Sequence, residues 1–215
     1  MDTKKRLTQF ADSHPVRMFP TLVWRADLTE DERTRVNASI LSAVRRLRQS
    51  VPPLQPGEGW QSKHDLQNCD TFADLLACVN VAVSEVLNFL KIGHQALTVT
   101  GCWVNVLAPG KGHRAHNHPN NFLSGVYYVK THAGADTVNF HDPRPQTHIV
   151  RPPVTELTAD NTDQVVVKVN DGVLLLFPAW LEHSVDENRS SEERISVSFN
   201  VMFAGYSESM TAPMW

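Results

Sequence analysis

Three histidines have the spacing of a metal site. His116 and His118 are separated by a single residue, and on an extended backbone such residues point the same way, so both imidazoles can face one ion. His183 comes much later, after an apolar run over residues 172–177 and a turn marked by Pro178. A β-barrel would bring these distant positions together. Because imidazole suits iron, zinc, copper and nickel, the ligand type alone leaves the metal open.

The segments that must position these histidines change in kind along the chain. Residues 1–95 are expected to be mainly helical. A capping box at 29–32 opens a first helix, apolar residues then recur at helical spacing, and Pro52-Pro53 ends the run. A second helix is predicted to start near Asp70. Its apolar face consists of Leu75, Val79, Val83, Val86 and Leu90.

The second half of the chain has the pattern of short strands separated by turns. The expected strands cover 97–107, 123–130, 137–140, 165–169, 172–177 and 194–203. The turn Asn170-Asp171-Gly172 suggests a hairpin. Helices followed by closely spaced antiparallel strands predict an α+β fold. We expect a double-stranded β-helix, a jelly-roll or cupin-like barrel with the N-terminal helices packed on one sheet.

No linker or internal repeat is visible, so residues 1–215 are predicted to form a single domain. In that domain, residues 1–95 would be mainly helical support and residues 96–205 the β-barrel core. Oligomeric state is open, and a homodimer that pairs through edge strands or helices is one expectation.

The last predicted strand alternates between polar and apolar residues. Its polar positions are Arg194, Ser196, Ser198 and Asn200, and its apolar positions are Ile195, Val197 and Phe199. A period of two puts these sets on opposite faces of a sheet. The polar set could simply face water. We favour an interior position, where it would meet a polar ligand, because the apolar faces of the predicted helices need a partner and the apolar set supplies one.

Composition narrows the class of protein. Hydrophobic residues make up 41%, charged residues 20%, and the net charge is −3, which is ordinary for a globular protein and predicts no nucleic-acid partner. The three cysteines Cys69, Cys78 and Cys102 form no C-x-x-C pair, which favours a reducing compartment. No run of about 18 consecutive apolar residues occurs. We therefore expect a soluble, cytoplasmic protein with no membrane partner.

The two histidine segments resemble the metal-binding segments of cupins. Gly110 precedes His116 and His118 with five residues between, and Gly172 precedes Pro178 and His183 in a similar pattern. Two departures are visible. A Glu expected in the first segment is missing, with Phe122-Leu123 there, and Trp180 replaces a Gly in the second.

A basic residue narrows the comparison further. Arg194 lies eleven residues after His183, at the start of the next predicted strand, and this order resembles the 2-oxoglutarate/Fe(II) oxygenases. The chain is most similar to a bacterial and phage family of such oxygenases with unassigned substrates. The blocks that carry the resemblance are Gly59–Ser62 with Asp65-Leu66, Trp103–Asn105, His116–Pro119, Ser124–Val129, Asp142–Arg144, Leu176–His183 and Glu193–Asn200.

The resemblance implies cofactors and roles. His116, His118 and His183 would hold Fe(II), and Arg194 would grip the C5 carboxylate of 2-oxoglutarate through its planar fork. Tyr128 and Ser198 could donate to the same carboxylate. With O2, the enzyme would decarboxylate 2-oxoglutarate to succinate and hydroxylate a substrate, a small molecule or a protein, which the sequence does not name.

Several positions keep alternatives open. Oxygenases of this type commonly have a carboxylate where His118 stands, and Asp142 could coordinate in place of His116 or His118. Possible roles around the metal or substrate fall to Asn105, Asn200 and Trp103. His113 either lines the entrance or is solvated.

Two other functions compete with the oxygenase hypothesis. One is a cupin-like three-histidine metalloenzyme that works without 2-oxoglutarate. The other is a non-catalytic metal- or ligand-binding barrel.

Overall fold

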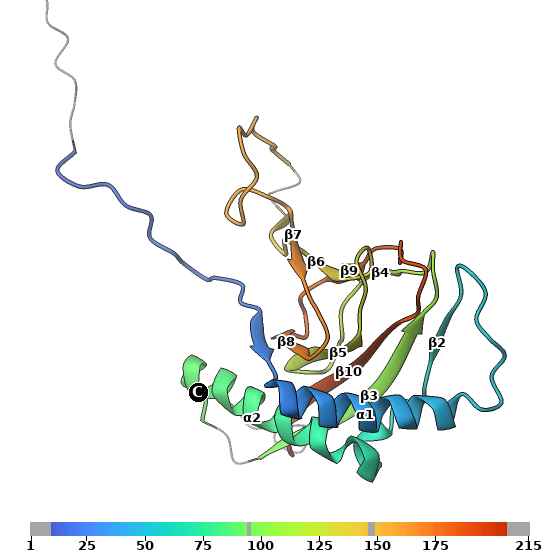
Figure 1. The fold of residues 1–215 in the computed structure, drawn as a ribbon. Helices are drawn as coiled ribbons and strands as arrows, with labels where there is room; N and C mark the ends of the chain where they lie inside the picture. Colours follow the sequence, from blue (N-terminus) through green and yellow to red (C-terminus); the bar gives the residue numbers. More distant parts are fainter. Residues whose placement is uncertain (1–9, 94–95, 146–148, 206–215) are drawn as a thin grey trace, which may run out of the picture.

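The computed structural model describes residues 10–93, 96–145 and 149–205, and Figure 1 shows how they are arranged. Two 18-residue helices lie in the first half of the chain, α1 over Glu30–Leu47 and α2 over Ala73–Leu90. Short 3-10 helices at Leu66–Asn68 and Asp70–Phe72 lead into α2. The ends predicted for the domain, residues 1 and 215, lie outside the described residues, and the single-domain assignment stays a prediction.

The strands form two antiparallel sheets. In chain order the strands are β1 Trp24–Asp27, β2 Gly59–Gln61, β3 Leu97–Leu107, β4 His113–His116, β5 Leu123–Lys130, β6 Thr137–His141, β7 Gln164–Lys168, β8 Val173–Pro178, β9 His183–Val185 and β10 Arg194–Phe203. The larger sheet has the order β1-β8-β5-β10-β3-β2, and the smaller has the order β4-β9-β6-β7. From β3 to β10 the chain passes back and forth between the sheets, except at β6 and β7, which pair within the smaller sheet. This is the order of a double-stranded β-helix, which confirms the predicted α+β jelly roll.

Both helices cover the outer face of the larger sheet (Figure 1). Thr29 caps α1 by accepting the Glu32 backbone N–H at 3.4 Å, and the first turn is acidic, as the helix dipole favours. Val36 and Ile40 of α1 pack in one buried cluster with Val197 and Phe199 of β10. Burying each such side chain stabilises the fold by about 1.5–3 kcal/mol. The apolar face of the last strand therefore meets the helices, as predicted.

A second apolar cluster fills the space between the two sheets. Tyr128 of β5 and Phe177 of β8 lie there against Val138 and Phe140 of β6. Because Val197 and Phe199 face the helices, the alternate residues of β10 face this interior. Arg194 and Ser196 are among them, and both are buried. The prediction that the polar set of β10 lines the barrel is thus confirmed.

Four short strands and one turn differ from the sequence-based expectations. The strands that were not predicted are β1, β2, β4 and β9, since three or four residues are too few for a periodic signal. β1 and β2 each extend one edge of the larger sheet. The hairpin expected at 170–172 is wrong. Gly172 does occupy a left-handed turn with φ 89°, but β7 pairs with β6, and β8 pairs with β1 and β5. The turn therefore carries the chain from one sheet to the other.

The second helical segment has an unexpected composition. Over Asp70–Leu90 it is long and apolar enough to cross a membrane, judged by length and composition alone. Its residues Leu75, Val79 and Val83 are buried in the cluster beneath the larger sheet. Such packing is typical of a core helix, and the core accounts for the apolar face that the sequence showed.

Candidate metal centre

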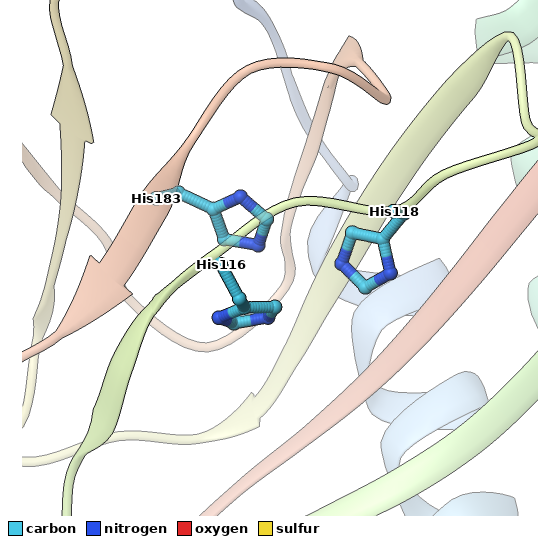
Figure 2. A group of neighbouring side chains, drawn as sticks. All are labelled: His116, His118 and His183. Atoms are coloured by element: carbon cyan, nitrogen blue, oxygen red, sulfur yellow. The ribbon is translucent and has the colours of Figure 1, made fainter.

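The three predicted histidines meet at one end of the barrel. One ring nitrogen from each of His116, His118 and His183 lies within 4.8 Å of the others, and Figure 2 shows the rings gathered around a common space. The ring centroids are 4.4 Å apart for His116 and His183, and 5.3 Å apart for His118 and His183. This spacing allows all three to bind one ion.

Strand pairing explains how residues so far apart in sequence meet. His116 at the end of β4 is directly opposite His183 at the start of β9. His118 follows β4, where its backbone N–H donates to the carbonyl of Ala179 at 2.9 Å. The His183 ring packs against Phe177, with centroids 4.7 Å apart. The smaller sheet thus fixes two ligands, and the segment after β4 supplies the third.

Backbone carbonyls set which ring nitrogen is available for metal. Nδ1 of His183 lies 2.9 Å from the Leu181 carbonyl oxygen, and Nδ1 of His116 lies 2.8 Å from that of Arg114. A carbonyl only accepts, so each Nδ1 carries the proton and donates. The lone pair is then on Nε2, which is the usual way in which a second hydrogen bond orients a ligating imidazole.

The electrostatics keep His118 and His183 neutral. Burial, reinforced by neighbouring histidines, lowers the pKa of both His118 and His183 to about 4. Neutral imidazole is the form that binds a metal. Among the described residues the metal-compatible group contains no carboxylate, so a divalent ion bound here would keep its full charge.

Asp142, the alternative ligand, is engaged elsewhere in the structure. Its Oδ2 lies 2.7 Å from Nη2 of Arg144, and its Oδ1 accepts the Arg144 backbone N–H at 2.9 Å. It is not part of the histidine group. The geometry therefore favours the three-histidine set over the alternative with a carboxylate.

Arg194 is a buried cation that forms no ion pair with a carboxylate of the described residues, although Asp136 acts on it electrostatically. It is 3% exposed, and its Nε has no hydrogen-bond partner within the part of the chain that the structure describes. Nη2 donates to the Thr137 carbonyl at 3.3 Å, and the guanidinium lies 5.1 Å from the centre of the Tyr128 ring. Burial lowers the Arg194 pKa and raises the Tyr128 pKa to about 12. Since an unpaired buried charge is costly, this donor set fits a ligand carboxylate.

Ser198 has a partner inside the barrel, and its role toward the carboxylate of 2-oxoglutarate stays a prediction. Its hydroxyl accepts from Nδ2 of Asn105 at 2.9 Å, and Asn105 also accepts from Nε2 of Gln61 at 2.6 Å. Four residues of strand span about 14 Å, so Ser198 stands well away from Arg194, whereas Ser196 stands about 7 Å along the strand. The period of two in the sequence could have indicated Ser196, which is buried on the same face.

The other interior polar residue of β10 is also satisfied within the barrel. Oδ1 of Asn200 accepts from the Ser124 hydroxyl at 2.7 Å. Asn105 and Asn200 therefore cross-link neighbouring strands of the larger sheet. This supports a structural role next to the site, while a role toward substrate stays a prediction.

Trp103 connects the metal group to a residue that sequence reasoning missed. Its ring stacks on His64 with centroids 4.2 Å apart and lies 5.8 Å from His118. His64 is exposed and had no motif context in the sequence. The pair forms an aromatic wall beside the third histidine, so Trp103 remains a candidate for contact with substrate.

Comparison with known proteins agrees with this site. Residues 101–200, which contain all three histidines and Arg194, match the family described as "Putative 2OG-Fe(II) oxygenase". The barrel is that of a 2-oxoglutarate/Fe(II) oxygenase. A comparison with curated proteins gives no match.

Solved oxygenase structures share the fold at low sequence identity. The epimerase SnoN of nogalamycin biosynthesis, described as α-ketoglutarate dependent, is 16% identical, with a TM-score of 0.60 over 86% of this chain and 79% of its own. A Pseudomonas putida prolyl-4-hydroxylase is 17% identical, with a TM-score of 0.56 over 86% and 94%. HygX from Streptomyces hygroscopicus, solved with nickel and 2-oxoglutarate, is 14% identical, with a TM-score of 0.60 over 86% and 83%.

Proposed function

We propose that this oxygenase couples decarboxylation of 2-oxoglutarate to hydroxylation of a small-molecule or protein substrate. The observation that carries the proposal is the buried Arg194, whose Nε has no partner among the described residues. It lies on the barrel interior that also holds the three histidines. A dicarboxylate that binds a metal at one end and needs a cation at the other fits this pair of features.

Different residues of the barrel would bind the iron and the co-substrate. His116, His118 and His183 would hold Fe(II) through their Nε2 atoms, with two rings oriented by backbone carbonyls. Arg194 would hold the far carboxylate of 2-oxoglutarate, with the Tyr128 ring packed beside it. Bound Fe(II) and 2-oxoglutarate would supply the activation of O2.

Aromatic packing beside the buried His183 serves the chemistry. Phe140 and Phe177 pack near His183 and limit water beside that ligand. Trp103 and His64 form a wall next to His118. We propose that the substrate approaches along this wall, since its rings offer an apolar contact surface.

Turnover of the co-substrate tests the proposal. Protein loaded with Fe(II) and supplied with O2 should convert 2-oxoglutarate to succinate, slowly even without a substrate, and His183→Ala should lose this conversion together with bound iron. Iron-dependent chemistry that is indifferent to 2-oxoglutarate would point instead to the three-histidine metalloenzyme. Bound iron without any turnover would point to a non-catalytic barrel.

We also propose a cytoplasmic location, without nucleic-acid or membrane partners. Cys69, Cys78 and Cys102 are all free thiols in the structure, which suits a reducing compartment. A tagged protein that fractionates with membranes or with an oxidising compartment would overturn this. The homodimer remains a prediction, to be tested by light scattering of the purified protein.

A further inference from the structure

His113 lies beside the metal group and has no role assigned so far. On β4 it is directly opposite Val185 of β9, and Val185 packs against the apolar cluster inside the barrel. Residues opposite each other on antiparallel strands share a face, so the His113 side chain faces the interior. Its ring centroid is 6.2 Å from that of His116, in an edge-to-face arrangement.

The charged groups that act on His113 are all cations or other histidines. The pKa of His113 is lowered to about 4, mainly by burial. Electrostatic interactions with His116, Arg194 and Lys111 lower it further. No carboxylate of the described residues is among them. Arg194 also interacts with Asp136, but Asp136 forms an ion pair with Lys168 at 3.4 Å. Among the described residues, donors therefore border the space between His113 and Arg194, and Asp136, which acts on Arg194, is shared with Lys168.

The His113 ring is also an unused donor. Among the described residues, the ring nitrogens of His113 make no side-chain hydrogen bond that would explain a purely structural role. By contrast, His116 and His183 each donate to a backbone carbonyl. A neutral imidazole always has one N–H to give. Among the described residues, Arg194 also has an unused N–H at Nε. These two donors face the interior from the two different sheets, so they can converge on one anion.

We propose that His113 is a second anchor for the distal carboxylate of 2-oxoglutarate, which it binds through an imidazole N–H while Arg194 binds through its guanidinium. The inference rests on the proposed function for the identity of the anion. It makes His113 a determinant of co-substrate specificity, since the imidazole contact is available only to a keto acid that carries a second carboxylate at that distance.

A pair of ligands separates this role from a structural one. 2-Oxoglutarate and 2-oxopentanoate have the same chain length and the same metal-chelating end, but 2-oxopentanoate lacks the distal carboxylate. Binding of each to the full-length Fe(II) protein without O2 is measured as a dissociation constant. His113→Ala should weaken binding of 2-oxoglutarate about tenfold, as loss of a hydrogen bond to a charged group does, and leave 2-oxopentanoate unchanged.

Two further variants complete the design. His113→Asn keeps an N–H donor and should retain most of the preference for 2-oxoglutarate. His141→Ala is the matched control, because His141 is on β6 of the same sheet and its Nε2 lies 2.9 Å from the Ser184 hydroxyl; both affinities should stay as in the wild type.

Equal affinities of wild type and His113→Ala for 2-oxoglutarate would overturn the inference, and so would an equal loss for both ligands. Failure of the wild type to bind 2-oxoglutarate at all would instead refute the proposed function. A thermal melt of each variant shows whether the fold is intact, so a misfolded alanine variant leaves the asparagine variant to decide.

Discussion

Two side chains determine how an anionic co-substrate would bind in the barrel, a neutral histidine at the metal and a buried arginine away from it. His118 carries no charge at neutral pH because burial lowers its pKa to about 4. Arg194 is buried, and its Nε has no hydrogen-bond partner in the described segments of the chain. A metal with neutral ligands and an unpaired cation both favour a dianion, so each residue yields a separable prediction.

Replacement of Arg194 should remove the anchor and spare the metal. We expect Arg194→Ala to weaken 2-oxoglutarate binding about a hundredfold, because a buried carboxylate would lose its partner. Iron content, measured by metal analysis after desalting, should not change. Arg17→Ala is the control, since Arg17 is exposed. Unaltered 2-oxoglutarate affinity in Arg194→Ala would remove this role from Arg194.

Replacement of His118 tests the charge of the site. His118→Asp keeps a ligand in place but lowers the net charge of the metal centre by one. We therefore expect iron to stay bound and the affinity for dianionic 2-oxoglutarate to fall by about tenfold. His118→Ala should weaken iron itself. If His118→Ala bound iron as well as the wild type, Asp142 or another group would have to be the third ligand.

At the scale of helices and strands, the sequence predicted what has a long periodic signal. Strands 97–107, 123–130 and 194–203 agree with the structure residue for residue, and alternation in the last of them gave its interior face. The sequence did not predict which strands pair. The turn at Gly172 was recognised, but which strands it joins depends on contacts far away in the chain, so the hairpin was wrong.

The candidate site was predictable in part for the same reason. The paired histidines and Arg194 have local motifs, and the period of two puts Ser196 on the same face as Arg194. His64 could be recognised only once neighbouring rings were in place. The alternation of polar and apolar residues predicts the face on which Ser198 lies. It does not indicate the partner of Ser198, which is Asn105.

The central strands leave no room at one glycine. A Cβ on Gly125 of β5 would lie 2.3 Å from the Phe199 ring and 2.7 Å from the Leu175 carbonyl oxygen. We expect Gly125→Ala to lower the free energy of unfolding by about 1–3 kcal/mol through overpacking, measured by urea denaturation. Gly93→Ala is the control, because nothing lies within 4 Å of its Cβ position. A wild-type midpoint for Gly125→Ala would contradict the packing of β5 on β10.

At the scale of the whole molecule, the fold brings neutral histidines together at one end of the barrel. The two helices cover the outer face of the larger sheet (Figure 1). Keeping His113, His118 and His183 neutral makes stability depend on pH. The pKa of each falls from 6.5 to about 4 on folding. Between those values the unfolded chain binds more protons, so acid favours unfolding.

The metal-free protein should therefore lose stability as pH falls from about 6.5 to about 4, the range between the two pKa values. Above this window the stabilisation is complete. Thermal melts in a chelator at several pH values measure it. Asp27, whose pKa is lowered from 3.8 by its hydrogen bond to Arg25, acts at lower pH and does not obscure the window. A melting temperature that stays flat or rises across the window would contradict the neutral site.

The most direct test of the oxygenase assignment is an anaerobic titration of the purified full-length protein with Fe(II) and then 2-oxoglutarate. Chelation of the iron by the keto acid should produce a weak visible charge-transfer band that saturates at one equivalent. The band should be absent in His183→Ala, and Arg194→Ala should need more 2-oxoglutarate to reach it. Iron that binds to the wild type without any such band would contradict the account.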